Sequence, residues 1–218
     1  MRSIRAVFFD CDGVLLDSEK IFLRCLQNRL AQYKTPLSIS DLSEVLGKDM
    51  KGITAQIDAK WGLSMVDLEV FSNQVRRDFH EEFFSASLHP MTGLTDVLQQ
   101  LKKKNIRLAV VSSSKRNYVA YVLDALGIAD YFDFYLGRED VQQAKPDPEI
   151  YQLALKRARL QADEVLVIED STSGIQAAKK AGCHVLAYKG SEIVQDTSGA
   201  DWTIASYDAF RLQDYVDL

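Results

Sequence analysis

The chain has 218 residues, of which 47% are hydrophobic and 26% charged, and its formal net charge is −5. This composition predicts a globular protein with one large domain and an insert, or with two domains. Lys and Arg are scattered, so the charge pattern excludes the basic patch of a nucleic-acid-binding protein. No apolar run approaches the roughly 18 residues of a membrane-spanning helix.

The amino terminus and the cysteines indicate the expected compartment. Met1–Ile4 leads directly into the first predicted strand with no cleavage site of a secretory signal. The three cysteines have unrelated spacings, which favours reduced thiols over disulfides. We therefore expect a cytoplasmic protein with no membrane and no nucleic-acid partner. The sequence does not set the oligomeric state, and a monomer is favoured.

Two aspartates end the first predicted strand, in the run Val7-Phe8-Phe9-Asp10-Cys11-Asp12-Gly13-Val14. Side chains two residues apart share a face of extended chain, so Asp10 and Asp12 converge, and alternation directs Cys11 into the core. Two close carboxylates repel each other unless a cation or a proton relieves them. Asp and Gly also favour turns, so this run alone predicts either a turn or an active site.

A helical segment follows the first strand, from about residue 18 to about residue 86. Apolar residues recur there with the 3.6-residue period, as in Ile21-Phe22, Cys25-Leu26 and Leu30, and later in Val70-Phe71 and Val75. The segment ends in small and turn-forming residues at 85–90, where we expect a hinge. We interpret it as an all-helical insert.

From Met91 onward, predicted helices and strands alternate. Two helices are expected near 94–104 and 115–126, a third begins at Pro148 with Asp147 as its N-cap, and a fourth ends at Gly182. The strands are expected at 107–112, 134–135, 165–168, 184–188 and 202–204. This alternation predicts an α/β fold with a Rossmann-like parallel sheet covered on both faces. Ligands bind beyond the carboxyl ends of the strands in such folds.

Further polar residues are expected at this edge of the sheet. Ser112 ends the second strand and Ser113 follows it, just before a helix that begins near Lys115, which suits either an anion-binding turn or a helix cap. Lys145 lies in a loop stiffened by two prolines, where a lone lysine is normally solvated. Glu169 and Asp170 follow another strand, as a helix cap or as ligands of a hard metal.

The order of these motifs resembles the haloacid dehalogenase-like superfamily, whose phosphatases carry D-x-D-G-[TV], a strand-end Ser or Thr, a Lys and an acidic pair in this order. The resemblance covers essentially the whole chain. It implies a catalytic core of residues 1–16 and 88–218 and a helical cap of residues 17–87. The most similar branch contains beta-phosphoglucomutase and small sugar-phosphate phosphatases.

The resemblance implies a magnesium-dependent phosphatase that acts on a small phosphorylated metabolite, a sugar phosphate above all. Asp10 would attack phosphorus to form an aspartyl-phosphate, and Asp12 would protonate the leaving oxygen. Magnesium would bind the side chains of Asp10 and Asp170 and the backbone carbonyl of Asp12. Glu169 would bind it directly or through a water molecule.

The phosphate group of the substrate would bind Ser112, Ser113 and Lys145, as it does at the matching positions of the family. A phosphate ester is an anion, so a metal ion and a cationic side chain must neutralise its charge before a carboxylate can attack it. A catalytically silent binding protein is disfavoured, because every expected catalytic residue is present.

The runner-up activity is that of a beta-phosphoglucomutase-type phosphosugar mutase. That branch has a cap His and a phosphate-gripping Arg where the simplest alignment places Phe22 and Met50. Lys48 and Lys51 flank Met50 and are the candidate substrate contacts of the cap, although Lys lacks the bidentate fork of Arg. They are equally well explained as solvated loop lysines, so the sequence favours the phosphatase.

Overall fold

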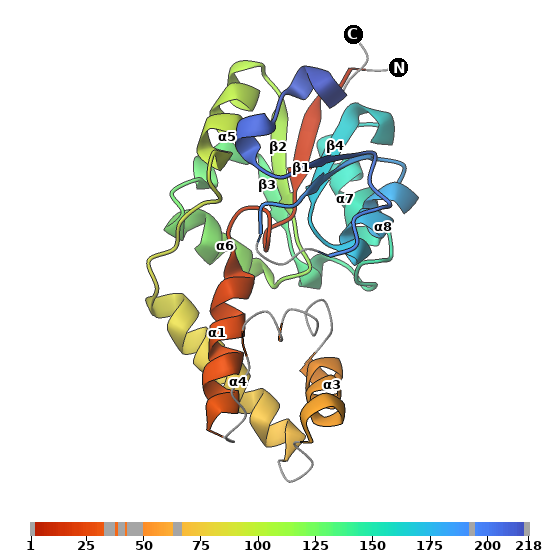
Figure 1. Ribbon diagram of the computed structural model, residues 1–218. Coiled ribbons are helices and arrows are strands. Elements are labelled where there is room, and N and C mark those ends of the chain that lie inside the picture. The colour runs from red at the N-terminus through yellow and green to blue at the C-terminus, as the bar shows by residue number, and fades with distance from the viewer. Residues whose placement is uncertain are drawn as a thin grey trace. The chain divides into compact units, whose positions relative to one another are not determined.

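The computed structural model describes residues 3–32, 38, 42, 50–62, 67–191 and 195–215 (Figure 1). The chain divides into two compact units. One combines Met1–Asp17 with Leu88–Leu218, and the other is Ser18–Ser87. The first unit holds the sheet, and the second is helical where it is described.

The first unit is built on a six-stranded sheet of order β3-β2-β1-β4-β5-β6, in which every neighbouring pair is parallel. The strands are β1 Ala6–Phe9, β2 Arg107–Val111, β3 Phe134–Leu136, β4 Val165–Glu169, β5 His184–Tyr188 and β6 Trp202–Ile204. The predicted Rossmann-like α/β class is confirmed by this topology. β1, with the two aspartates at its end, lies between β2 and β4.

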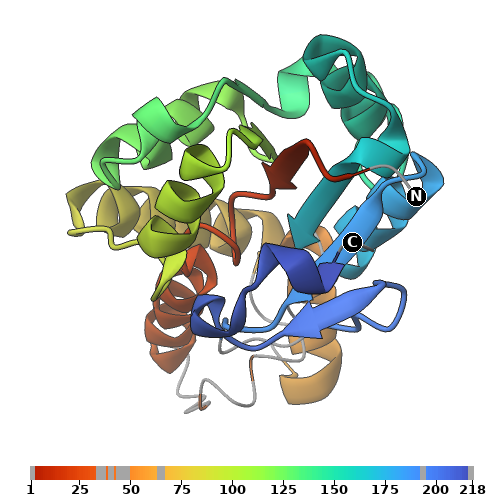
Figure 2. The ribbon, with the colours of Figure 1, turned by 90° about the horizontal axis from the view of Figure 1, so that it is seen from above.

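Apolar side chains cover both faces of the sheet. Four larger helices belong to this unit: α5 Leu94–Lys103, α6 Arg116–Ala125, α7 Glu149–Ala158 and α8 Thr172–Lys180. Ala6 and Phe8 of β1 pack in one buried cluster with residues of α7 and α8. The alternate residues Val7 and Phe9 are equally buried, so they face the other side. Figure 2 shows α5 on the side of the sheet opposite α7 and α8.

Strand register places the predicted site residues at one edge. Phe9 is paired with Val110 on one side and with Ile168 on the other. Asp10 is therefore level with Glu169 on the neighbouring parallel strand, and Asp170 follows one residue later at the same edge. The backbone N–H of Asp10 donates to the Ile168 carbonyl at 2.9 Å, which extends this alignment by one residue.

Several predicted boundaries differ from the structure by one residue, and those of α7 and β4 bear on the site. α7 begins at Glu149 with Pro148 in the N-cap position, because Asp147 caps the helix from one residue earlier, where its carboxylate accepts the Glu149 N–H at 3.0 Å. β4 also extends to Glu169, which is paired with Ala187 of β5. Glu169 is therefore the last strand residue, with no exposed surface.

The described part of the second unit contains helices α1 Ser18–Ala31, α3 Met50–Trp61 and α4 Leu68–Ser85. Asp67 caps α4 by accepting the N–H groups of Glu69 and Val70. Arg29 of α1 donates through Nε to the Asp78 carboxylate of α4 at 2.8 Å. The expected apolar face is correct at Phe71 and Val75 but wrong at Val70, which is half exposed because it lies off the helix face that these two residues share.

The expectations of no membrane-spanning helix and of reduced cysteines can be compared with the described residues. None of their helices combines the length and the apolar character that a membrane crossing requires. The three cysteines are free and buried, and Cys11 is fully buried as its place in the strand pattern predicts.

Candidate active site

A tight loop after β1 presents the two aspartates. The Leu15 N–H donates to the Cys11 carbonyl at 2.8 Å, and the Gly13 N–H to the Leu16 carbonyl at 2.9 Å. Gly13 has a φ of +72°, and a Cβ there would overlap the Asp170 carboxylate. Glycine is thus required for two reasons, and Asp170 packs directly against the loop that carries Asp10 and Asp12.

Lys145 connects the carboxylates of two neighbouring strands. Its Nζ donates to Asp10 Oδ1 at 2.6 Å, to Glu169 Oε1 at 2.6 Å and to the Val111 carbonyl at 2.9 Å. Only 3% of its side chain is exposed. Burial of a lysine is tolerated when all three of its protons find acceptors, as they do here. The structure therefore replaces the solvated interpretation of this residue with a buried site cation.

The loop that carries Lys145 is held from several directions. Arg138 donates to the Val141 and Gln142 carbonyls, and the Glu149 carboxylate accepts the N–H groups of Gln142 and Gln143. These contacts precede Lys145 and fix the approach of its backbone. The ammonium is thereby preorganised, a state that favours electrostatic catalysis.

The charges of the site interact strongly. Burial raises the pKa of Asp10 from 3.8 to about 7; Lys145 opposes this rise, and Glu169 and Asp12 add to it. Burial alone would lower the pKa of Lys145, but Asp10 and Glu169 together raise it well above its ordinary value. With Asp170, four carboxylates face one ammonium, so the site carries an excess of negative charge that a cation would relieve.

Glu169 has few lone pairs left for a metal. Its Oε1 accepts hydrogen bonds from Lys145 and from the buried Tyr151 hydroxyl at 2.9 Å. Its Oε2 accepts from the Ser171 hydroxyl at 3.0 Å and from the Ser171 N–H at 3.3 Å. An ionised carboxylate has about four acceptor positions, and these bonds use them. Glu169 is thus placed to hold Lys145.

The donor set suits a hard divalent cation. Asp10, Glu169 and Asp170 each offer a carboxylate oxygen, and these oxygens lie within 4.8 Å of one another. Magnesium prefers oxygen ligands and retains several waters, so two or three protein oxygens are sufficient. Because Glu169 is engaged with Lys145, Asp10 and Asp170 are the residues expected to hold Mg²⁺ directly, together with the predicted backbone carbonyl of Asp12.

This difference predicts unequal losses of metal affinity. Asp170→Ala removes an expected direct ligand and should weaken Mg²⁺ binding more than Glu169→Ala. The second change should act through Lys145, with the 10- to 100-fold loss typical of groups that orient ligands. Isothermal titration of both variants with Mg²⁺ measures the order, and a larger loss in Glu169→Ala would contradict it.

The raised pKa of Asp10 predicts that the binding of Mg²⁺ depends on pH. Below about pH 7 Asp10 carries a proton, which a metal must displace, so apparent affinity should fall about tenfold per pH unit. Above pH 7 Asp10 is already ionised and affinity should level off. Titrations from pH 5.5 to 8.5 test this, with Asp10→Asn as the control that should flatten the profile.

Ser112 directly follows β2 and has 1% of its surface exposed. Its hydroxyl oxygen accepts the Ser114 N–H at 3.0 Å, a bond that leaves the hydroxyl hydrogen able to donate. Ser113 is exposed. The first N–H of α6, that of Arg116, already donates to the Glu139 carboxylate at 2.9 Å. The expected anion-binding turn is therefore partly occupied by the protein's own carboxylate.

Asp12 has two partners that the sequence analysis missed. The Ser114 hydroxyl donates to Asp12 Oδ2 and the Tyr118 hydroxyl to Oδ1, both at 2.7 Å. Tyr151, the buried partner of Glu169, was missed as well. Their place along the chain was the one feature of the sequence that could have identified Ser114 and Tyr118 as site residues, because Ser114 follows a strand end and Tyr118 lies in the first turn of α6.

The predicted cap contacts are not placed. Lys48 lies outside the described residues, and for Met50 and Lys51 only the helical backbone of α3 is described. Phe22 packs edge to face on Phe79, with ring centroids 6.0 Å apart. It is therefore a packing residue within its own unit.

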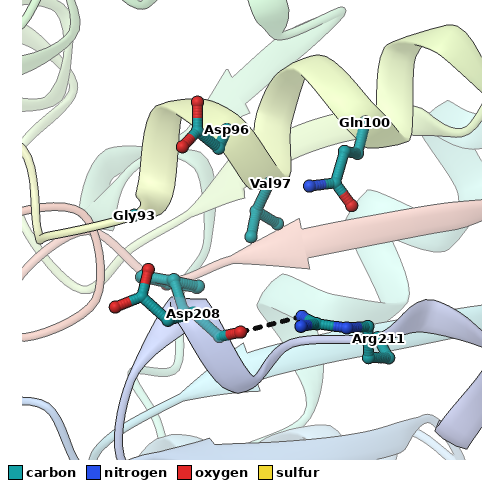
Figure 3. A pocket seen from close by; sticks show the side chains of 7 residues that line it. Gly93, Asp96, Val97, Gln100, Asp208 and Arg211 are labelled. Atoms are coloured by element: carbon teal, nitrogen blue, oxygen red, sulfur yellow. Dashed lines mark hydrogen bonds between the residues drawn. The ribbon is translucent and has the colours of Figure 1, made fainter.

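A separate hollow of about 390 Å³ lies between α5 and the short helix Tyr207–Ala209 (Figure 3). Asp96 and Gln100 line it from α5, opposite Asp208 and Arg211. The Arg211 guanidinium donates to the Asp208 and Phe210 carbonyls, so this cation is engaged by backbone. None of the predicted site residues lines this hollow.

The profile of the haloacid dehalogenase-like hydrolases matches residues 7–188. The chain belongs to this family. It is 33% identical over 181 residues to the phosphorylated carbohydrates phosphatase of Thermotoga maritima, covering 82% of each chain. It is 30% identical over 190 residues to the phosphoglycolate phosphatase of Yersinia pseudotuberculosis, covering 84% of this chain and 79% of that one.

A solved structure from Thermotoga maritima, provisionally assigned as a beta-phosphoglucomutase, superimposes with a TM-score of 0.75 at 28% identity. The match covers 92% of this chain and 94% of that one. The resemblance drawn from the motifs is thus confirmed, as is the predicted class of enzyme, a phosphatase of the haloacid dehalogenase-like hydrolases.

Proposed function

We propose that this enzyme hydrolyses the phosphate monoester of a small phosphorylated metabolite, a sugar phosphate in the first place, through an aspartyl-phosphate on Asp10. The observation that carries the proposal is the buried Lys145, whose Nζ lies 2.6 Å from Asp10 at the edge of the sheet. A carboxylate beside a fixed cation is suited to attack an anionic phosphorus centre. The carbohydrate phosphatase among the relatives supports the choice of substrate.

The proposed reaction has two steps. A carboxylate oxygen of Asp10 forms a bond to phosphorus while the ester bond to the leaving oxygen breaks, and Asp12 gives its proton to that oxygen. Water then attacks phosphorus and gives a proton to Asp12, which releases inorganic phosphate and restores Asp10. Ser112 binds a phosphate oxygen in both steps, and so does Lys145 once that oxygen replaces one of the present acceptors of its ammonium group.

Magnesium, held by Asp10 and Asp170, would supply positive charge that offsets the negative charge of the transferring group. Glu169 acts by fixing Lys145, and Tyr151 by fixing Glu169. The family uses Mg²⁺ in general, and the oxygen-only donor set agrees with it.

Phosphate release from a panel of phosphorylated metabolites, measured with and without Mg²⁺, tests the proposal. We expect the sugar phosphates to be the preferred class and turnover to cease in excess chelator. Undiminished turnover with chelator, or no release from any ester in the panel, would contradict the proposed function.

We also expect water to be preferred over return of the phosphoryl group to a sugar. Phe22 stands where the mutase branch has its cap histidine, and it packs on Phe79. The decisive assay supplies beta-glucose 1-phosphate with a trace of the 1,6-bisphosphate and follows glucose 6-phosphate and free phosphate together. Free phosphate should dominate. If glucose 6-phosphate forms faster, the mutase alternative is correct, and Lys48 and Lys51 become the first residues to mutate.

A further inference from the structure

We propose that Tyr118 and Ser114 are positioning residues that hold the carboxyl group of Asp12 in place for proton transfer. The inference rests on the proposed role of Asp12 as general acid. Both residues belong to the same compact unit as Asp12. Neither is one of the residues implied by the family motifs.

The two hydroxyls reach opposite oxygens of one carboxyl group. Ser114 donates to Oδ2 and Tyr118 to Oδ1, each at 2.7 Å. Two donors on separate oxygens fix both the position and the plane of the group, which one hydrogen bond would not do. Rotation about the Cα–Cβ and Cβ–Cγ bonds of Asp12 is thereby restricted to one arrangement.

The supporting backbone is itself anchored. The Ser114 N–H donates to the Ser112 hydroxyl at 3.0 Å, and the Ser114 carbonyl accepts the Arg138 N–H at 2.8 Å. A Cβ at Gly137 would come within 2.8 Å of the same Ser114 carbonyl, so the two segments pack closely. Tyr118 extends from the first turn of α6, which begins at Arg116. Rigid support of this kind is what a precisely placed catalytic group needs.

Hydroxyl partners suit a group that changes its protonation state. A serine or tyrosine hydroxyl can donate to the ionised carboxyl and, after rotation, accept from the protonated one. Asp12 therefore keeps its partners when it carries the proton in the first step and when it receives one in the second. A lysine or arginine in the same place could only donate.

The test separates esters that need a proton from those that do not. Single-turnover release of the alcohol reports the first step alone, for a sugar phosphate and for 4-nitrophenyl phosphate. Nitrophenolate leaves without protonation, whereas an alkoxide does not. We expect Tyr118→Phe and Ser114→Ala each to slow release from the sugar phosphate about tenfold, a fraction of the full contribution of a general acid, with aryl release nearly unchanged.

Controls keep the outcomes distinct. Tyr131→Phe removes a phenol hydroxyl of the same unit outside the site and should change neither rate. Asp12→Asn should slow the sugar ester far more than the aryl ester. If it slows both equally, the proposed role of Asp12 is wrong. A third outcome is that Asp12→Asn slows the sugar ester more than the aryl ester while Tyr118→Phe and Ser114→Ala slow neither ester, or slow both equally. That result overturns the positioning role and leaves the proposed function standing.

Discussion

Asp10→Asn should abolish turnover, with a loss of about four orders of magnitude or more, as removal of a nucleophile does in other enzymes with covalent intermediates. The substitution preserves the size of the side chain and removes one of the excess negative charges. The amide that replaces the carboxylate is a far weaker nucleophile, so no phosphoryl group should transfer. Retained folding is checked by circular dichroism.

The covalent step can be measured directly. A beryllium fluoride adduct should attach to Asp10 in the native enzyme and should be absent from Asp10→Asn. Asp12→Asn is the matched control, because it alters a neighbouring aspartate of the same loop and should still form the adduct. Attachment to Asp12 instead would reverse the two proposed roles.

The strand-end residues were predictable because the parallel strands share one sequence pattern, an apolar run followed by polar residues. Asp10, Ser112 and Asp170 each follow an apolar run, and the register of β1 with β2 and β4 brings these ends together. No contact had to be known to expect this, since the carboxyl ends of neighbouring parallel strands form one edge.

The partners of these residues were not predictable in the same way. Tyr118 meets Asp12 from 106 positions further along the chain, and its place on α6 gives no sign of which way the ring points. Whether Glu169 binds a metal directly was also open. That depends on Tyr151 and Ser171, whose hydroxyls could equally have faced solvent as far as the sequence indicates.

Gly13→Ala is expected to lower turnover by up to about a thousandfold. Alanine at a φ of +72° costs about 1–2 kcal/mol of conformational energy. Its Cβ would in addition overlap the Asp170 carboxylate, which has to move away. A displaced Asp170 would no longer serve as the expected ligand, so the cation would bind less tightly. Complete loss of the several kcal/mol that a metal contributes to the transition state corresponds to about three powers of ten in rate.

Gly127→Ala separates the two causes. Gly127 has a similar φ of +65°, and a Cβ there would meet no atom within 4 Å. Both variants should lose about the same free energy of unfolding from backbone strain, but Gly127→Ala should keep its Mg²⁺ affinity and turnover. Denaturant unfolding and Mg²⁺ titration of the pair measure the two effects independently. Equal metal affinity in the two variants would show that Gly13 is required for its conformation alone, and that close packing against Asp170 does not support the metal site.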